Sequence, residues 1–202
     1  MSTHLKHEKY ITLAIVVGFT AQIFCFALSS IIYPPDYSTS IPKYAPESSV
    51  ILELGFALFI FGTTVMAIKL ADEKKVLAAA GFTMLAISTG VIMSSVFETT
   101  QSTTVEAVEK SYYIVTSSNF LYLPAMLLIS ACDEFKKWVR VLGLISAVPL
   151  WACSFLFLFH YRNFTNLDFI GITGYALMMF VQLMWAINVY NNHKRKKSAS
   201  NN

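Results

Sequence analysis

Charged residues are scarce in this chain, and their scarcity is the first constraint on its class. Only 13% of the 202 residues are Asp, Glu, Lys or Arg, whereas 55% are hydrophobic. A soluble domain of this size needs charged side chains along its whole length to keep its surface hydrated, but here the charges form short clusters between runs of about twenty apolar residues. This pattern excludes an ordinary soluble fold and is typical of a protein that crosses a bilayer.

Cysteine and histidine are too few and too scattered to indicate disulfide, metal or haem chemistry. Cys25 and Cys153 fall inside apolar runs and Cys132 stands at a junction, so no pair lies in an exposed loop. No histidine lies within an apolar run, and the His-Glu-x-x-His, Gly-x-Ser-x-Gly and phosphate-binding Gly-Lys-Ser/Thr patterns are missing. The sequence therefore predicts no catalytic residue, no metal site and no cofactor, and it disfavours an enzyme.

Six apolar stretches are each long enough to cross a bilayer as a helix, which takes roughly twenty residues at about 1.5 Å per residue. These predicted spans are residues 11–33, 50–68, 76–97, 112–132, 139–159 and 169–190. Lipid offers the backbone no hydrogen-bond partner, so each span must be helical. We therefore expect an all-α, polytopic transmembrane bundle of six helices that forms a single domain and ends in a short basic tail, residues 191–202.

The first stretch also has to be distinguished from a signal peptide. It is longer than a signal core and ends in Tyr33-Pro34-Pro35 instead of a small-residue cleavage site. We therefore expect it to be a membrane-spanning helix of the mature protein.

Lysine and arginine indicate how the spans are oriented, because loops rich in these residues stay on the cytoplasmic side. If both termini are inside, twelve of the fifteen basic residues lie in the cytoplasm. The three outside are Lys43, Lys110 and Arg162. We therefore predict a multi-pass protein of a cell membrane, either a plasma membrane or a bacterial inner membrane, with both termini cytoplasmic. The formal net charge of +3 is then a sided charge that sets topology and not a nucleic-acid patch.

Polar residues within or beside the spans are the candidate site residues, since ionisable groups at membrane depth are costly. Glu53 lies about one helical turn below the predicted outer boundary and Glu98 caps the third span. Together with Asp36, His160, Arg162 and Asp168 they predict an acidic outer vestibule that binds a cation or proton; the alternative is interfacial charges that face water or pair with one another.

Three amide side chains lie deeper in the spans, and we expect them to face the interior of the bundle. They are Gln22, Asn119 and Gln182. One reading is interhelical hydrogen bonding worth about 0.6 to 2 kcal/mol per bond. The other is that they line an outward-facing cavity beneath Glu53.

Two further patterns concern the organisation of the chain. The segments at residues 71–77 and 132–139 both place acids before a pair of lysines, which indicates either a duplicated helical hairpin or the ordinary needs of two tight cytoplasmic turns. Pro124 and Pro149 lie in the bodies of spans four and five, and each is predicted to kink its helix.

Three segments carry a resemblance to a known group of proteins. They are Leu52-Glu53-Leu54, the Lys-Lys turn after span two, and Leu142-Gly143-Leu144-Ile145 at the start of span five. In this layout the chain resembles bacterial six-span membrane proteins grouped as domains of unknown function. The resemblance implies the topology alone, with no activity and no site residue.

Three functional classes follow from the sequence. The first is a non-enzymatic accessory or interaction protein, whose partners are the lipid bilayer and other membrane proteins and not nucleic acid. The second is a small transporter or channel, in which Glu53 and Glu98 bind a small ion and Gln22, Asn119 and Gln182 line its path. The third is a lipid-active membrane enzyme that uses His160 and the outer acids. Separately, Met178, Met179 and Met184 in span six are either packing residues or part of an adaptable pocket for a lipophilic ligand.

Overall fold

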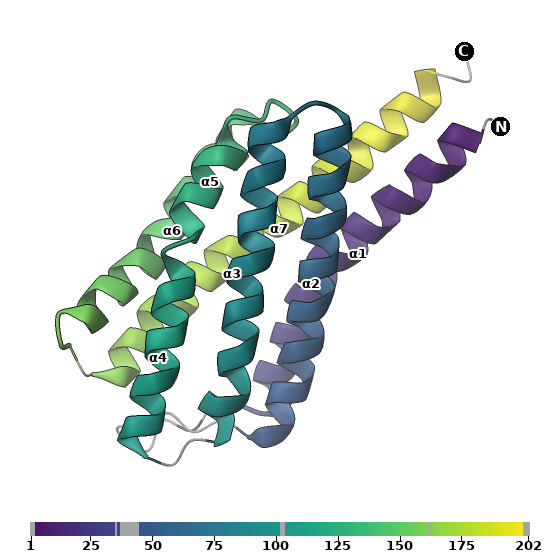
Figure 1. The fold of residues 1–202 in the computed structure, drawn as a ribbon. Helices are drawn as coiled ribbons and strands as arrows, with labels where there is room; N and C mark the ends of the chain where they lie inside the picture. The colour runs from purple at the N-terminus through teal and green to yellow at the C-terminus, as the bar shows by residue number, and fades with distance from the viewer. Residues whose placement is uncertain (1–2, 35, 37–44, 102–103, 162, 200–202) are drawn as a thin grey trace.

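The computed structural model describes residues 3–34, 36, 45–101, 104–161 and 163–199, except for the side chains of residues 3–6, 96–101, 105, 164, 197 and 199. These residues form seven α-helices, of which α4 and α5 follow one another in the same direction and every other consecutive pair is antiparallel (Figure 1). The helices are α1 (Thr3–Ile32), α2 (Pro46–Asp72), α3 (Val76–Gln101), α4 (Val105–Asn119), α5 (Tyr122–Ser130), α6 (Lys137–Leu158) and α7 (Phe164–Ala199).

The predicted all-α bundle of six membrane-spanning helices is confirmed. Six helical segments are long and apolar enough to cross a membrane, and α4 and α5 together supply the fourth of them as Glu106–Ser130. Both termini lie at one end of the bundle, together with the α2–α3 turn and the α5–α6 connection, and we call this the terminal end (Figure 1). Helix α7 continues through the segment predicted as a tail as far as Ala199.

Proline breaks the fourth span but not the fifth. Pro124 has no N–H to donate to the carbonyl of Phe120, and the chain leaves the α-helix at Phe120 and Leu121 before α5 begins. The Leu121 N–H bonds instead to the carbonyl of Ser118, three residues back. Pro149 lies inside α6, which is helical on both sides of it. Where the sequence predicted a kink at Pro124, the structure thus has a two-residue interruption between α4 and α5, and the kink predicted at Pro149 stays a prediction.

The six spans close into a ring. Each helix or helix pair packs against its neighbours in sequence, and α1 packs against α7 to complete the circle. Small residues allow the closest approaches, since side chains larger than hydrogen would separate the backbones. A Cβ added to Gly18 on α1 would lie 2.5 Å from the Cα of Gly62 on α2, and one added to Gly81 on α3 would lie 2.7 Å from the Ala125 carbonyl oxygen. These contacts fix the register of the neighbouring helices.

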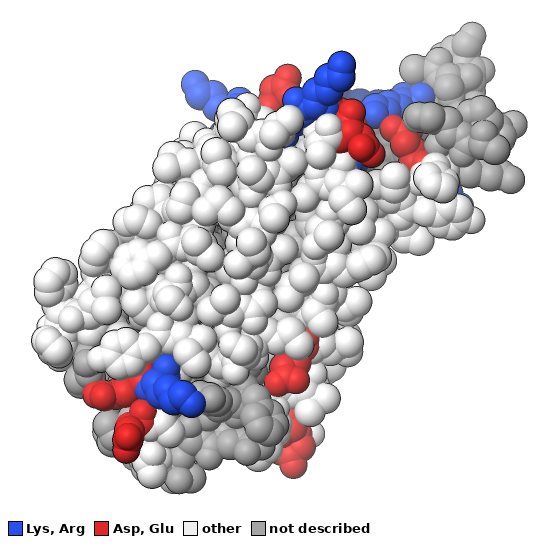
Figure 2. All heavy atoms as spheres, in the orientation of Figure 1, with Lys and Arg blue, Asp and Glu red and all other residues white. Residues whose placement is uncertain are grey.

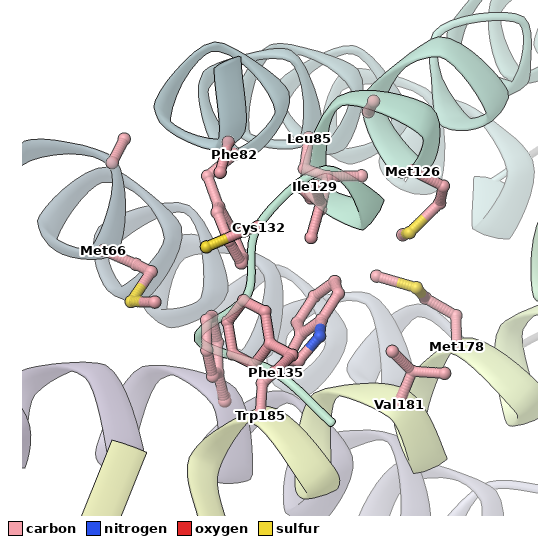
Figure 3. Packing of buried hydrophobic residues seen from close by; sticks show 14 of the residues in the cluster. Met66, Phe82, Leu85, Met126, Ile129, Cys132, Phe135, Met178, Val181 and Trp185 are labelled. Carbon is pink, nitrogen blue, oxygen red and sulfur yellow. The ribbon is translucent and has the colours of Figure 1, made fainter. Parts of the chain in front are cut away.

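Aromatic side chains from five elements fill the ring near its terminal half. Phe19, Phe59, Phe82, Phe135 and Trp185 are all almost fully buried. The Phe82 and Trp185 rings meet edge to face with centroids 5.0 Å apart, and the Phe135 ring lies 5.8 Å from that of Trp185. Figure 3 shows Phe82, Phe135 and Trp185 facing one another at the centre of the bundle. We call these five residues the aromatic cluster.

Phe135 reaches this cluster from a connection, not from a helix. It lies in the α5–α6 connection, residues 131–136, between charged residues, yet its side chain is only 1% exposed. The connection therefore folds into the terminal end of the bundle instead of passing over it. A smaller apolar cluster of Val108, Tyr112, Cys153, Phe157 and Leu167 fills the other end.

Candidate functional site

The described residues include only part of the predicted acidic vestibule. Glu53 is partly exposed on α2 and makes no hydrogen bond or ion pair with any described residue. Glu98 belongs to α3, but its side chain is outside the described residues, as is the whole of Arg162. Asp36 is exposed. Whether these groups share an ion therefore stays a prediction.

Asp168 and His160 lie in different surroundings from each other. The half-buried Asp168 carboxylate accepts a hydrogen bond from the hydroxyl of Tyr112, which ties the start of α7 to α4. His160 is exposed in the α6–α7 connection, and its φ of 63° is in the left-handed region. No described carboxylate bonds to its imidazole, so the structure offers no acid–base pair around His160 among the described residues.

Asn119 is engaged in hydrogen bonds between helices. It is 1% exposed at the end of α4, and its side-chain Nδ2 donates to Ser154 Oγ at 3.2 Å on α6. Its Oδ1 accepts from the hydroxyl of Tyr175 on α7, also at 3.2 Å. The amide thus joins three spans just where Pro124 interrupts the fourth. The sequence predicted that Asn119 faces inward, but it gave no indication of Ser154 and Tyr175 as its partners.

A pair of serines joins α3 to α4 at a similar interior position. Ser88 and Ser118 are fully buried, and their hydroxyls lie 2.8 Å apart. Each hydroxyl also lies within hydrogen-bond distance of the other residue's carbonyl oxygen, at 3.1 and 2.8 Å. Interhelical bonds of this kind are the usual role of hydroxyls in membrane spans.

Gln22 and Gln182 differ from these polar residues because their carbonyl oxygens have no partner. Gln22 on α1 is 7% exposed and Gln182 on α7 is 2% exposed. The Oε1 atom of each is buried without a hydrogen bond in the described structure, and so is the indole Nε1 of Trp185. Both glutamines therefore face the interior, as predicted. Their Oε1 atoms accept no interhelical hydrogen bond from the described residues.

The terminal end carries a dense network of ion pairs centred on Glu134, in the same connection as Phe135. Its carboxylate accepts from Lys75 Nζ at 2.6 Å and from Asn192 Nδ2 at 2.9 Å, and it lies 3.8 Å from Lys69 Nζ. Glu73 in turn lies 2.8 Å from Lys69 and 3.4 Å from Lys75. The network therefore connects α2, the α2–α3 turn, the α5–α6 connection and α7, and it covers the aromatic cluster.

A second set of ion pairs extends this network to both chain ends. Lys196 Nζ on α7 lies 3.0 Å from Glu8 Oε1 on α1 and 3.8 Å from Glu73 Oε1. Figure 2 shows Lys and Arg gathered at the terminal end and a middle zone of the molecule free of charged residues on the visible face. The sequence predicted lysines here as topology signals and missed that acids of the two similar turns bind them.

Glu134 and Lys75 hold each other in the charged state. Burial disfavours the Glu134 carboxylate, but hydrogen bonds from Lys75 and Asn192 and attraction to Lys69 and Lys75 outweigh burial and lower the pKa of Glu134. Burial likewise disfavours the Lys75 ammonium, but its hydrogen bond to Glu134 and its attraction to Glu134 and Glu73 outweigh burial and raise the pKa of Lys75. Both groups are therefore charged at neutral pH. Their ion pair joins the α2–α3 turn to the α5–α6 connection, which is a structural role.

The thiols and acids of the described residues do not assemble into a metal centre. Cys25, Cys132 and Cys153 are all buried and free. Among the described side chains, no three His, Cys, Asp or Glu residues come close enough together to hold an ion. Met126 and Met178 face one another near the aromatic cluster, where they act as packing residues (Figure 3).

Together, the six apolar helices and the sided charges define a polytopic α-helical membrane protein. Compared with known protein families, curated protein sequences and solved structures, the chain shows no significant match. What the protein does is therefore inferred from its own geometry.

Proposed function

We propose that this protein is a non-enzymatic accessory or interaction protein of a cell membrane, with both termini in the cytoplasm. The observation that carries the proposal is a projection at the terminal end. There the ends of α1 and α7 run side by side beyond the rest of the bundle (Figure 1). Helix α7 has 36 residues and is about 54 Å long, well above the roughly 30 Å of a hydrocarbon core.

The projection has a defined composition. We define it as residues 7–10 of α1 and 191–198 of α7, joined by the Lys196–Glu8 ion pair. Lys9, Lys194 and Arg195 are exposed on it. Exposed basic side chains on two rigid, mutually braced helices suit an acidic protein surface, because complementary charge speeds and orients association. The projection is thus the surface through which we propose that the protein contacts its partner.

Neutralising the projection tests this role. A photo-crosslinker placed at exposed Ser198 in cells should give a discrete adduct with one partner, and Lys194→Gln with Arg195→Gln should reduce the yield several-fold. Lys136→Gln with Lys137→Gln is the matched control, because both lysines are exposed at the same end but outside the projection. The partner, identified and purified, should bind the wild type and not the double variant.

Two results would refute this proposal. One is an adduct yield that is equal in the double variant and the control. The other is loss of binding to anionic lipid vesicles in place of loss of a protein adduct, which would assign the projection to headgroups.

A small transporter or channel is the second candidate, favoured by one observation. Gln22 and Gln182 place unpartnered carbonyl oxygens deep in the span region, where polar groups without a bond are costly. The test is flux through vesicles reconstituted with the wild type and with Glu53→Gln. An ion flux that the wild type supports and the variant loses would replace the accessory role with transport.

The lipid-active enzyme is the least supported class. It requires His160 and a carboxylate within hydrogen-bond distance of each other. The described residues provide no such pair, because the His160 imidazole is exposed and bonds to none of their carboxylates.

A further inference from the structure

Two buried amides on facing helices have no partner for their carbonyl oxygens. Gln22 is only 7% exposed and Gln182 only 2% exposed. Neither Oε1 atom accepts a hydrogen bond from the described residues. A buried amide oxygen without a hydrogen bond is costly, so two of them on helices in contact call for a specific reason.

The two amides lie at the same level of the bundle. Helices α1 and α7 are antiparallel and in contact, and the rings of Phe19 and Trp185 lie 5.7 Å apart between them. Gln22 follows Phe19 by three residues, and Gln182 precedes Trp185 by three. Each glutamine is thus about one turn from the ring contact, on the same helix face and in the same direction away from the terminal end.

A third unpartnered polar atom belongs to Trp185, about one helical turn from Gln182 on α7. The indole Nε1 of Trp185 is buried without a hydrogen bond. Figure 3 shows this nitrogen on the side of the ring toward Met178 and Val181. On the α2 side, Gly55 faces Gln22, since a Cβ added to Gly55 would lie 3.3 Å from the Gln22 Cα. Gly55 therefore lets α2 pack closely against α1 beside Gln22.

The two glutamines do not satisfy one another. No hydrogen bond joins them, although buried amides at one level of neighbouring helices commonly pair. Asn119, at the α4–α6–α7 contact, has its amide engaged on both sides. The difference shows that this bundle can satisfy an interior amide with its own side chains, and that at Gln22 and Gln182 it does not.

We propose that Gln22 and Gln182, with the indole N–H of Trp185, form a binding site between α1 and α7 for a small neutral molecule with hydrogen-bond donors and acceptors. The molecule donates to the two Oε1 atoms and accepts from the indole. It is neutral because none of the described ion pairs involves a residue at this level, and an uncompensated charge at this depth is costly. A primary carboxamide and water share this chemistry. The site goes beyond the accessory role and does not depend on it.

Acetamide is the probe, because it has the donors and acceptors of a carboxamide and no charge. The full-length protein in lipid nanodiscs should show a saturable rise in Tm with acetamide. Binding should be at least about fivefold weaker in Gln182→Met, and likewise in Gln22→Met, which remains available if Gln182→Met fails to fold. Asn188→Leu on α7 is the matched control, because its amide bonds to the Met184 carbonyl of its own helix. It should respond to acetamide like the wild type.

Side-chain amide NMR of the same samples separates the two sources of the ligand. Water cross-peaks at both Gln22 and Gln182, without a saturable effect of acetamide, would identify the molecule as water and support the site. The proposal is overturned by neither acetamide binding nor water contact at these amides, or by acetamide binding that both methionine variants retain.

Discussion

Two polar regions of the molecule differ in how completely their groups are hydrogen-bonded. One is the ion-pair network around Glu134, which we call the terminal network, and the other is the proposed site at Gln22 and Gln182, which we call the amide site. Glu134 at the terminal end has partners from α2, the α2–α3 turn and α7, whereas Gln22 and Gln182 leave their carbonyl oxygens unbonded. In the first arrangement each charge offsets the desolvation of another, so the loss of one partner would leave a buried charge uncompensated. The second weakens the fold unless a further molecule supplies the missing bonds.

The two regions are separated by the aromatic cluster, whose five side chains are almost fully buried. Phe19 and Trp185 border the amide site on one side, and Phe135 lies beneath the Glu134 network on the other. The cluster thus isolates the amide site from the charged terminal end. Variants that change the aromatic cluster, the Glu134 network and the interior amides one at a time can test how much each contributes to stability.

The largest effect is expected from Phe135→Ala. The substitution leaves a cavity among Phe82, Trp185 and their neighbours, and we expect the free energy of unfolding to fall by about 3 kcal/mol. This value is at the lower end of the usual range for Phe→Ala, because on unfolding the ring moves into detergent and not into water. Thermal unfolding in detergent measures it. Trp138→Ala is the control, because Trp138 is near Phe135 in sequence but half exposed. Equal losses in both variants would refute the insertion of Phe135 into the bundle.

Glu134→Ala should have the next largest effect. Lys75 then keeps a partly buried ammonium without its closest partner, and we expect a loss of about 2 kcal/mol in the same assay. Asp133→Ala removes a neighbouring carboxylate that is 89% exposed and 3.7 Å from Lys75, so it should change stability by less than about 0.5 kcal/mol. A loss for Asp133→Ala as large as that for Glu134→Ala would mean that net charge matters and not the buried pair.

Asn119→Ala should destabilise the bundle by about 1 kcal/mol, the size measured for hydrogen bonds between membrane helices. The variant leaves the Tyr175 hydroxyl and Ser154 without their amide partner. Ser117→Ala is the control, because the exposed Ser117 hydroxyl bonds only to the Ile114 carbonyl of its own helix. If both variants unfold at the same temperature, the interior amide of Asn119 contributes no more than a surface hydroxyl.

The smallest effect is expected in the pH dependence of stability. The folded-state pKa of Glu134 is lowered, so its contribution is fully present above the ordinary carboxyl pKa of 4.5 and is lost as the pH falls through the lower folded value. Between pH 7 and pH 3 the wild type should therefore lose more stability than Glu134→Gln, as measured by Tm. Asp133→Asn should follow the wild type. Identical acid profiles for the wild type and Glu134→Gln would remove Glu134 from the network's energetics.

Much of the architecture could be predicted from the sequence. The six spans, a distortion at Pro124 and the inward orientation of Gln22, Asn119 and Gln182 all follow from local rules, because hydrocarbon forces helices, proline lacks an N–H and polar groups avoid lipid. Each of these rules acts on a residue or a short stretch alone. The site was less predictable, because it depends on which helices face each other.

The burial of Phe135 shows where local reasoning fails. A phenylalanine between charged residues in a short connection has the pattern of an exposed turn, and the lysines around it were predicted only as topology signals. Its burial depends on space left by Phe82 and Trp185, which come from α3 and α7. A single aromatic residue within a charged turn was the one signal that could have indicated an insertion.

The sequence by itself determined the class of this protein: a chain of six apolar stretches, with most of its basic residues in alternate loops, has no stable fold outside a bilayer. Tertiary structure alone decided which polar groups are bonded. Asn119 meets Ser154 and Tyr175, whereas Gln22 and Gln182 meet no partner for their carbonyl oxygens. Hydrogen bonds act over about 3 Å, and only the packing of helices distant in sequence sets separations that small.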